Sequence, residues 1–192
     1  MTALPVLPRR PLTVADYEAL PEDEQHRWEL LEGNLVIAPS PSVDHAEAMG
    51  NLYEQLKRQC PSDVVVLQDI DVDLQLAPPD GPGSVRRPDL VVVDQAERDR
   101  VRVEGGILRA SGVRLIVEIV SPGSIRTDRI IKHAEYADAG IPCYWILDLE
   151  SPVSLVAYRL AGELGYVEDG EATGTFTTTE PYPLTIALDR LV

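Results

Sequence analysis

Two acidic residues lie in stretches of the sequence that otherwise favour a dry interior. Asp89 opens the run Asp89-Leu90-Val91-Val92-Val93, and Glu118 lies within Arg114-Leu115-Ile116-Val117-Glu118-Ile119-Val120. Short runs of aliphatic and β-branched residues indicate strands that are buried on both faces. A carboxylate in such a strand is costly unless it is paired or bound to a cation. The sequence therefore predicts that Asp89 and Glu118 share a divalent metal ion.

The chemistry of such a site follows from its ligands. Mg²⁺ prefers hard oxygen ligands and keeps several waters, so two carboxylates and one backbone carbonyl, that of Ile119, are sufficient. Mg²⁺, or Mn²⁺ in its place, would polarise a phosphodiester oxygen and lower the pKa of a bound water. A cation beside the phosphate would stabilise charge in the transition state, and Lys132, on the helix expected after the Glu118 strand, is the candidate.

Hydrophobic periodicity places the elements that must hold these residues. Residues 28–31 and 35–37 are expected to form an N-terminal hairpin with a Gly-Asn turn. Further strands are expected at 64–67, 70–76, 89–93, 114–120 and 143–149, with a C-terminal antiparallel extension after them. Helices are expected at 13–20, at 44–60 and after Ser124, with a short helix in the polar segment 94–112. In the helix after Ser124, the core-facing residues should be Ile130, Ala134 and Ala137.

This order of elements predicts an α/β fold, a mixed β-sheet flanked by helices. The chain of 192 residues is expected to form a single domain over 1–192, in which the proline-rich residues 1–11 are a loose arm. Cys60 and Cys143 stand far apart, which indicates free thiols in a reducing compartment. With no leader pattern and no membrane-length apolar run, the sequence predicts a cytoplasmic protein.

The charge is strongly acidic, at −15, which ordinarily argues against binding to nucleic acid. The low aromatic content, 5%, also argues against a base-stacking platform for single strands. The segment from Arg86 to Lys132, however, holds ten Lys or Arg against seven Asp or Glu. Either these arginines merely solvate loops, or they form a basic lip beside the metal pocket. On the second interpretation the residues that contact nucleic acid are Arg86, Arg87, Arg126 and Arg129.

Several motifs together resemble the Uma-type family of restriction-endonuclease-like proteins, a branch of the PD-(D/E)XK nuclease superfamily. They are Arg87-Pro88-Asp89, Val117-Glu118-Ile119-Val120-Ser121-Pro122, Asp128 with Lys132 and Tyr136, and the run from Gly140 to Asp148. The resemblance extends upstream to the runs 28–33 and 39–42 and to His45, and covers roughly residues 12–160. No single motif is specific, but their order and spacing are.

The resemblance implies a restriction-endonuclease-like fold and a Mg²⁺-dependent endonuclease acting on DNA. Asp89 and Glu118 carry over as metal ligands, and Glu29 as a further ligand or a supporting contact. The lysine that the superfamily places two residues after the glutamate is Val120 here, so its role passes to Lys132. His45 carries over as an accessory group that orients a phosphate or a water.

Each of these residues also has a purely structural interpretation. Asp89 could cap a loop, and Glu118 could pair with Arg87 or Arg114. Lys132 could belong to an exposed stripe with Asp128 and Tyr136 at helical spacing. Glu29 and His45 could face water, while Trp28 and Trp145 are most simply core residues.

For the molecule as a whole, the alternative to an endonuclease is an inactive nuclease-like protein kept for binding or assembly. A homodimer could bring two basic lips together around a DNA duplex.

Overall fold

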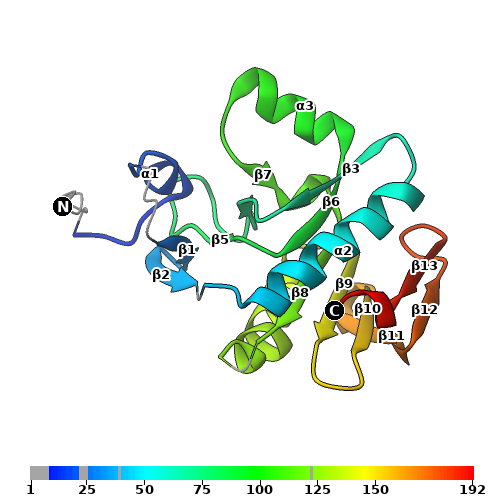
Figure 1. Cartoon of the computed structure of the whole chain (residues 1–192). Helices are drawn as coiled ribbons and strands as arrows, with labels where there is room; N and C mark the ends of the chain where they lie inside the picture. The colour runs from blue at the N-terminus through cyan, green and yellow to red at the C-terminus, as the bar shows by residue number, and fades with distance from the viewer. Residues whose placement is uncertain (1–8, 22–25, 39, 122) are drawn as a thin grey trace.

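A six-stranded sheet forms the centre of the computed structural model, which describes residues 9–21, 26–38, 40–121 and 123–192. Its strand order is β11-β10-β9-β8-β6-β3 (Figure 1). The strands are β3 (Val64–Gln68), β6 (Leu90–Asp94), β8 (Val113–Val120), β9 (Cys143–Asp148), β10 (Ser154–Leu160) and β11 (Tyr166–Thr173). All neighbours are antiparallel except β8 and β9, which are parallel. The predicted mixed sheet is thus confirmed.

The two apolar runs that carry the acids lie at the centre of this sheet because both of their faces are covered. Along β8, Val117 belongs to one hydrophobic core and Ile116 to another. Helix α2 (Val43–Gln59) packs Ala48, Leu52 and Leu56 into the first core. The second core includes Tyr136 of helix α4 (His133–Asp138). The sheet therefore lies between helices, and an acid in β8 has little access to bulk water.

A smaller sheet lies beside the first and contains the N-terminal hairpin. Its order is β2-β1-β5-β4-β7, formed by β1 (Arg27–Leu31), β2 (Asn34–Ala38), β4 (Val72–Asp73), β5 (Val85–Arg86) and β7 (Leu108–Arg109). The hairpin turn is Glu32-Gly33, with φ values of 46° and 77°, and Asn34 already begins β2. The predicted Gly-Asn turn was therefore displaced by one residue. Left-handed φ at both positions is what a two-residue hairpin turn requires.

The strand predicted over residues 70–76 was too long, because β4 has only two residues. Positive φ values at Asp69 (52°) and Gln75 (56°) bend the chain on either side of it. Alternation of polar and apolar residues continues through both bends, so the sequence pattern does not reveal them.

Side-chain caps begin two of the helices. Helix α1 (Val14–Glu18) starts with a capping box between Thr13 and Asp16, and Ser42 caps α2. Helix α3 (Gln95–Glu104) fills the polar segment where a short helix was expected. A π-helix, η2 (Thr127–Lys132), leads directly into α4, and short 3₁₀ turns lie at Ala110–Gly112, Gly162–Leu164 and Leu188–Arg190.

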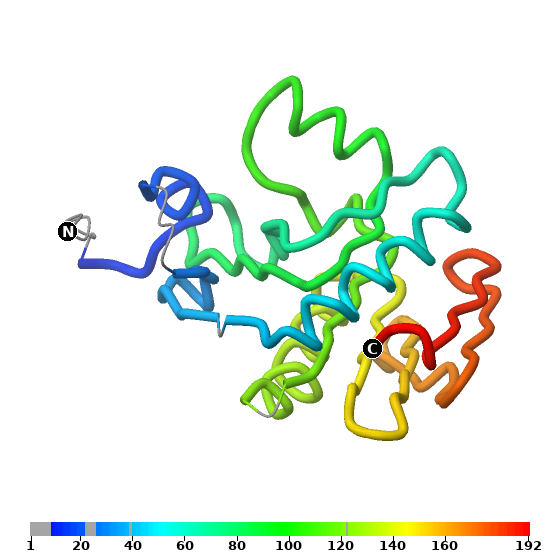
Figure 2. Tube along the Cα trace, viewed as in Figure 1, coloured from blue at the N-terminus to red at the C-terminus, as the bar shows by residue number. Residues whose placement is uncertain are grey.

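The C-terminal part forms the expected antiparallel extension. After β10 and β11, strands β12 (Thr175–Thr178) and β13 (Leu184–Ala187) pair with each other. Figure 2 shows this last hairpin beside α2. The amide side chains of Asn51, Gln55 and Gln59 on α2 bond to its backbone and to the residues after it.

Two further expectations concern the ends of the chain and the membrane. The loose arm predicted for residues 1–11 lies, up to Pro8, outside the described residues. In the described part of the chain, no helix has the length and apolar character needed to span a bilayer.

Candidate active site

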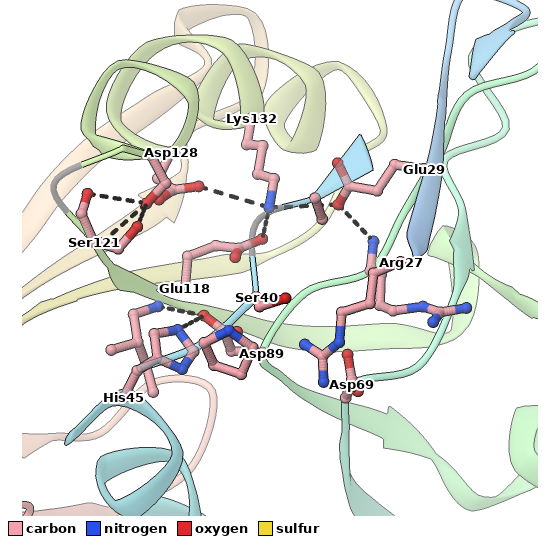
Figure 3. Close-up of a pocket in the computed structure, with 15 residues that line it drawn as sticks. Arg27, Glu29, Ser40, His45, Asp69, Asp89, Glu118, Ser121, Asp128 and Lys132 are labelled. Atoms are coloured by element: carbon pink, nitrogen blue, oxygen red, sulfur yellow. Dashed lines mark hydrogen bonds and ion pairs between the residues drawn. The ribbon is translucent and has the colours of Figure 1, made fainter. Parts of the chain in front are cut away.

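Strand pairing brings Asp89 and Glu118 to the same end of the central sheet. Strands β6 and β8 are antiparallel neighbours with Leu90 opposite Val117, and Asp89 immediately precedes β6. Both acids line one pocket, shown in Figure 3, with a cavity volume of about 70 Å³. At roughly 10–15 Å³ for each water, this cavity has room for several waters or for a small ion with its waters.

Asp89 is held through one of its two carboxylate oxygens. Oδ2 accepts a hydrogen bond from the backbone N–H of Ile119 at 2.7 Å, and it lies 3.2 Å from Nε2 of His45. His45 is in the first turn of α2, where its own N–H bonds to the cap residue Ser42. Burial alone would lower the pKa of His45, but the hydrogen bond and charge of Asp89 outweigh burial and raise it. Within the described residues, no hydrogen bond reaches Oδ1 of Asp89.

Glu118 is almost completely buried, at 3% exposure, and shares its carboxylate with two donors. Its Oε1 accepts from Nζ of Lys132 at 2.9 Å and from the Tyr136 hydroxyl at 2.6 Å. Burial raises the pKa of Glu118 to about 8, and the negative charges of Asp89 and Asp128 add to this effect while Lys132 opposes it. The predicted alternative, an ion pair with Arg87 or Arg114, was wrong, since those arginines bind Asp71 and Asp94.

Lys132 is buried among carboxylates rather than exposed on a helix surface. Its side chain is 9% exposed, and Nζ lies 3.6 Å from both Glu29 Oε1 and Asp128 Oδ1, in addition to Glu118. Burial alone would lower the pKa of Lys132, but these three carboxylates raise it, so the side chain is an ammonium at neutral pH. The exposed stripe considered above is thus excluded.

The helix geometry explains why three polar residues at a spacing of four face inward together. Asp128, Lys132 and Tyr136 are all buried, and Asp128 and Lys132 lie in the π-helical turn η2. The Tyr144 hydroxyl of β9 donates to the Asp128 carbonyl at 2.9 Å and fixes this turn over the sheet. Single π-helical turns are rare and occur frequently at functional sites. The predicted core face was wrong in Ile130, which is 61% exposed, and Ala134 is exposed as well.

Glu29 reaches the pocket from β1 and does not face water. It is 4% exposed and accepts from Nη1 of Arg86 at 2.8 Å and from the backbone N–H of Arg87 at 3.0 Å. Burial would raise the pKa of Glu29, but Lys132 and Arg86 lower it below its usual value. Glu29 is therefore a carboxylate held among positive charges, beside the pair of Lys132 and Glu118.

The predicted basic lip is largely neutralised by acids. Arg86 is 2% exposed and bound to carboxylates on two sides, so the prediction that it contacts nucleic acid does not agree with its position. Arg87 forms a bidentate ion pair with Asp71. Arg129 pairs with Asp148, whereas Arg126 is exposed at the start of η2.

Arg27 and Asp128 are among the charged pocket residues that the reasoning from sequence did not assign to the site. Arg27, at the start of β1, lines the pocket, is one-third exposed and pairs with Asp69. Asp128 was noted as part of a motif but was given no role in the site. A clue to Arg27 was its position two residues before Glu29, which places both on the same side of a strand.

The donor set for a metal ion is small. Within the described residues, no group of three or more His, Cys, Asp or Glu side chains is arranged to hold a metal ion. What the pocket offers is an excess of carboxylates, because Glu29, Glu118 and Asp128 share the ammonium of Lys132 and Asp89 stands beside them. A cation would relieve this excess of negative charge, and oxygen ligands of this kind suit Mg²⁺ or Mn²⁺.

Comparisons with known proteins agree with the fold. The family model Uma2, described as "Putative restriction endonuclease", matches residues 14–188. Among solved structures, the chain is similar to a nuclease-like protein of Anabaena variabilis ATCC 29413 described as belonging to DUF820. The two chains are 18% identical with a TM-score of 0.67, over 94% of this chain and 97% of the other. No curated protein matches the chain.

Proposed function

Since this chain belongs to the Uma2 family of restriction-endonuclease-like proteins, we propose that it is a metal-dependent endonuclease that hydrolyses phosphodiester bonds in DNA. The observation that carries the proposal is the meeting of Asp89, Glu118 and Lys132 in one pocket, although they are separated by 29 and 14 positions in the chain. Perturbed titratable groups that converge in a cavity are typical of catalytic sites.

The pocket suits a hard divalent cation in its chemistry. Asp89 and Glu118 would hold Mg²⁺ or Mn²⁺, with the Ile119 carbonyl as the third protein ligand. Glu29, which is bonded to Arg86 and Arg87, would support the site as a neighbouring carboxylate. When bound, the ion would supply a Lewis acid at the phosphate and a water of lowered pKa. Because both hydrogen bonds to Asp89 fall on Oδ2, its Oδ1 is available for coordination without loss of the contacts that orient the side chain.

The other side chains have roles that follow from their contacts. Lys132 is an ammonium at neutral pH and would stabilise the negative charge that grows on the phosphate. His45 acts as an accessory group that orients Asp89 through Nε2. Its Nδ1 is buried and has no hydrogen-bond partner within the described residues, so a buried water is the partner that fits it. Arg126 is exposed and placed for the DNA backbone, and Arg27 and Arg87 would contact it after release from Asp69 and Asp71.

The test is cleavage of plasmid DNA by the purified protein with Mg²⁺ or Mn²⁺, with EDTA as a control. We expect Asp89→Ala to abolish cleavage while the protein stays folded, as judged by circular dichroism. Asp80→Ala, in the exposed loop before β5, is the matched control and should cleave normally. An Asp89→Ala protein with full activity would refute the assignment.

A second candidate is a nuclease-like protein that binds nucleic acid or assembles without cutting. It is favoured by the net charge of −15 and by the pairing of Arg86, Arg87 and Arg129 with acids. Electrostatic attraction to phosphates usually supplies much of the affinity for DNA, and here it is limited. Metal-dependent cleavage that disappears in Asp89→Ala separates the two candidates.

We also propose a cytoplasmic homodimer. Two free thiols, Cys60 and Cys143, fit a reducing compartment, and burial raises their pKa to about 11 and about 12. A dimer would present two sets of the exposed arginines to a duplex. Sedimentation equilibrium gives the mass directly, and a mass near 21.1 kDa would contradict the dimer.

A further inference from the structure

A buried arginine next to the pocket makes contacts that the proposed chemistry does not use. Arg86 is 2% exposed and binds two carboxylates from different elements. Nη1 lies 2.8 Å from Oε2 of Glu29 on β1. Nε and Nη2 form a fork with both carboxylate oxygens of Glu135 on α4, at 2.7 and 2.8 Å. Since Arg86 itself belongs to β5, it links three elements, namely β5, β1 and α4.

This link acts on the helix that carries Lys132. Glu135 is three residues after Lys132 in the continuous helical segment formed by η2 and α4, less than one turn away. The next residue, Tyr136, bonds to Glu118 at 2.6 Å. The helix is thus anchored at consecutive residues, by Arg86 and by Glu118. The anchor at Glu135, made by Arg86, does not involve Glu118, the proposed metal ligand, whereas the anchor at Tyr136 does.

We propose that Arg86 is a positioning residue, which ties α4 to β1 through Glu135 and Glu29 and so fixes the Lys132 ammonium in the pocket. The inference rests on the proposed function, because the position of Lys132 matters only if it faces a reacting phosphate. It assigns Arg86 a role in place of the contact with DNA expected from the sequence.

The chemistry of the side chains explains why this position requires arginine. A guanidinium presents a rigid fork that matches a carboxylate edge and still has a third donor for a second carboxylate. A lysine ammonium would satisfy the charge but not the planar geometry. Misplacement of a reacting group by about 1 Å can cost roughly a hundredfold in rate, so a looser tie should reduce turnover before it reduces binding.

The main test compares two substitutions on one helix. Glu135→Gln removes the charge that Arg86 grips, and Asp138→Asn removes a charge at an exposed position of α4. At saturating DNA, we expect Glu135→Gln to lower the single-turnover cleavage rate at least tenfold. Its dissociation constant for DNA should stay within twofold of wild type, and Asp138→Asn should be unchanged in both. A Glu135→Gln protein that cleaves within twofold of wild type would overturn the proposal.

Arg86→Lys provides a second variant if Glu135→Gln does not fold. It retains the buried positive charge, so the same split between rate and affinity is expected. A role limited to stability would lower the melting temperature and leave the rate per folded molecule unchanged, which also overturns the proposal.

A third measurement does not require cleavage at all. The chain has two lysines, Lys57 and Lys132, and Lys57 is exposed. Acylation of the metal-free protein, followed by mass spectrometry, gives the reactivity of Lys132 relative to Lys57. We expect this ratio to rise at least fivefold in Glu135→Gln but not in Asp138→Asn. If the ratio in Glu135→Gln equals that of the wild type, Arg86 has no positioning role. If the wild-type protein does not cleave DNA, the proposed function is refuted, and the acylation result still stands by itself.

Discussion

At the scale of single residues, the pocket balances charge around one ammonium. Lys132 is bordered by Glu29, Glu118 and Asp128, so its removal leaves three carboxylates without their shared partner. In the proposed mechanism, the loss of Lys132 takes a positive charge away from the phosphate. It also leaves the acidic side chains around it without a cation that offsets their repulsion.

We predict that Lys132→Met lowers the cleavage rate by about 10²–10³-fold, the usual effect of removing one group that stabilises transition-state charge. Plasmid cleavage in Mg²⁺ measures this loss. Lys57→Met is the matched control, because it removes the other lysine of the chain from an exposed site on α2. Equal activity in the two variants would remove Lys132 from the mechanism.

The pH dependence of stability reports on Glu118. Burial raises its pKa from the ordinary 4.5 to about 8, so the folded state binds a proton that the unfolded state releases between these values. The contribution of this group to the free energy of unfolding is therefore complete below about pH 4.5 and falls as the pH rises toward 8.

Glu118→Gln should remove that part of the pH dependence. We predict that the difference in melting temperature between Glu118→Gln and wild type, measured in EDTA, shifts in favour of the variant from pH 5 to pH 8. A difference that is constant over this range would contradict a raised pKa for Glu118.

The sequence singled out Asp89 and Glu118, which line one pocket in the structure, because an acid inside an apolar strand is conspicuous without any knowledge of its neighbours. It misassigned Arg86 for the opposite reason. Arginine is ordinarily exposed, and the two acids that bury Arg86, Glu29 and Glu135, lie 57 and 49 positions away. Partners at such separations are set by topology, which the local pattern does not contain.

At the scale of elements, the helical segment formed by η2 and α4 turns polar side chains toward the sheet. A regular helix with Ile130, Ala134 and Ala137 inside would have satisfied the hydrophobic pattern. The structure instead buries Asp128, Lys132 and Tyr136, and leaves Ile130 exposed. The sequence therefore predicted the presence of this helix and the long central strands, but neither the rotation of the helix nor the bends around β4.

This rotation has a measurable consequence for stability. Ile130→Ser should change the free energy of unfolding by no more than about 0.5 kcal/mol, as expected for an exposed site. Tyr136→Phe removes a donor to a buried carboxyl and should cost about 1–3 kcal/mol. Urea unfolding of the two variants checks the order, and a larger cost for Ile130→Ser would contradict the observed face.

At the scale of the whole molecule, the proposed function requires a chain with a net charge of −15 to bind DNA, which is itself acidic. Most arginines between Arg86 and Arg129 are used within the fold, so few remain to release counterions from DNA. We predict that the affinity for DNA depends only weakly on salt concentration. In Arg27→Gln, the slope of log Kd against log salt should decrease by about one unit. Arg58→Gln, at the exposed far end of α2, should leave the slope unchanged. Fluorescence anisotropy with a labelled duplex measures both, and equal slopes would exclude Arg27 from the interface.

The three amide side chains that fasten α2 to the last hairpin have a consequence for the opposite end of that helix. Asn51, Gln55 and Gln59 bond to backbone groups more than 120 positions later. His45, which contacts Asp89, lies about two to four turns earlier on the same helix. Removal of the C-terminal tail would therefore loosen helix α2, whose N-terminal end contacts the pocket through His45. A protease that removes this tail would then lower the proposed cleavage activity without touching any residue that lines the pocket.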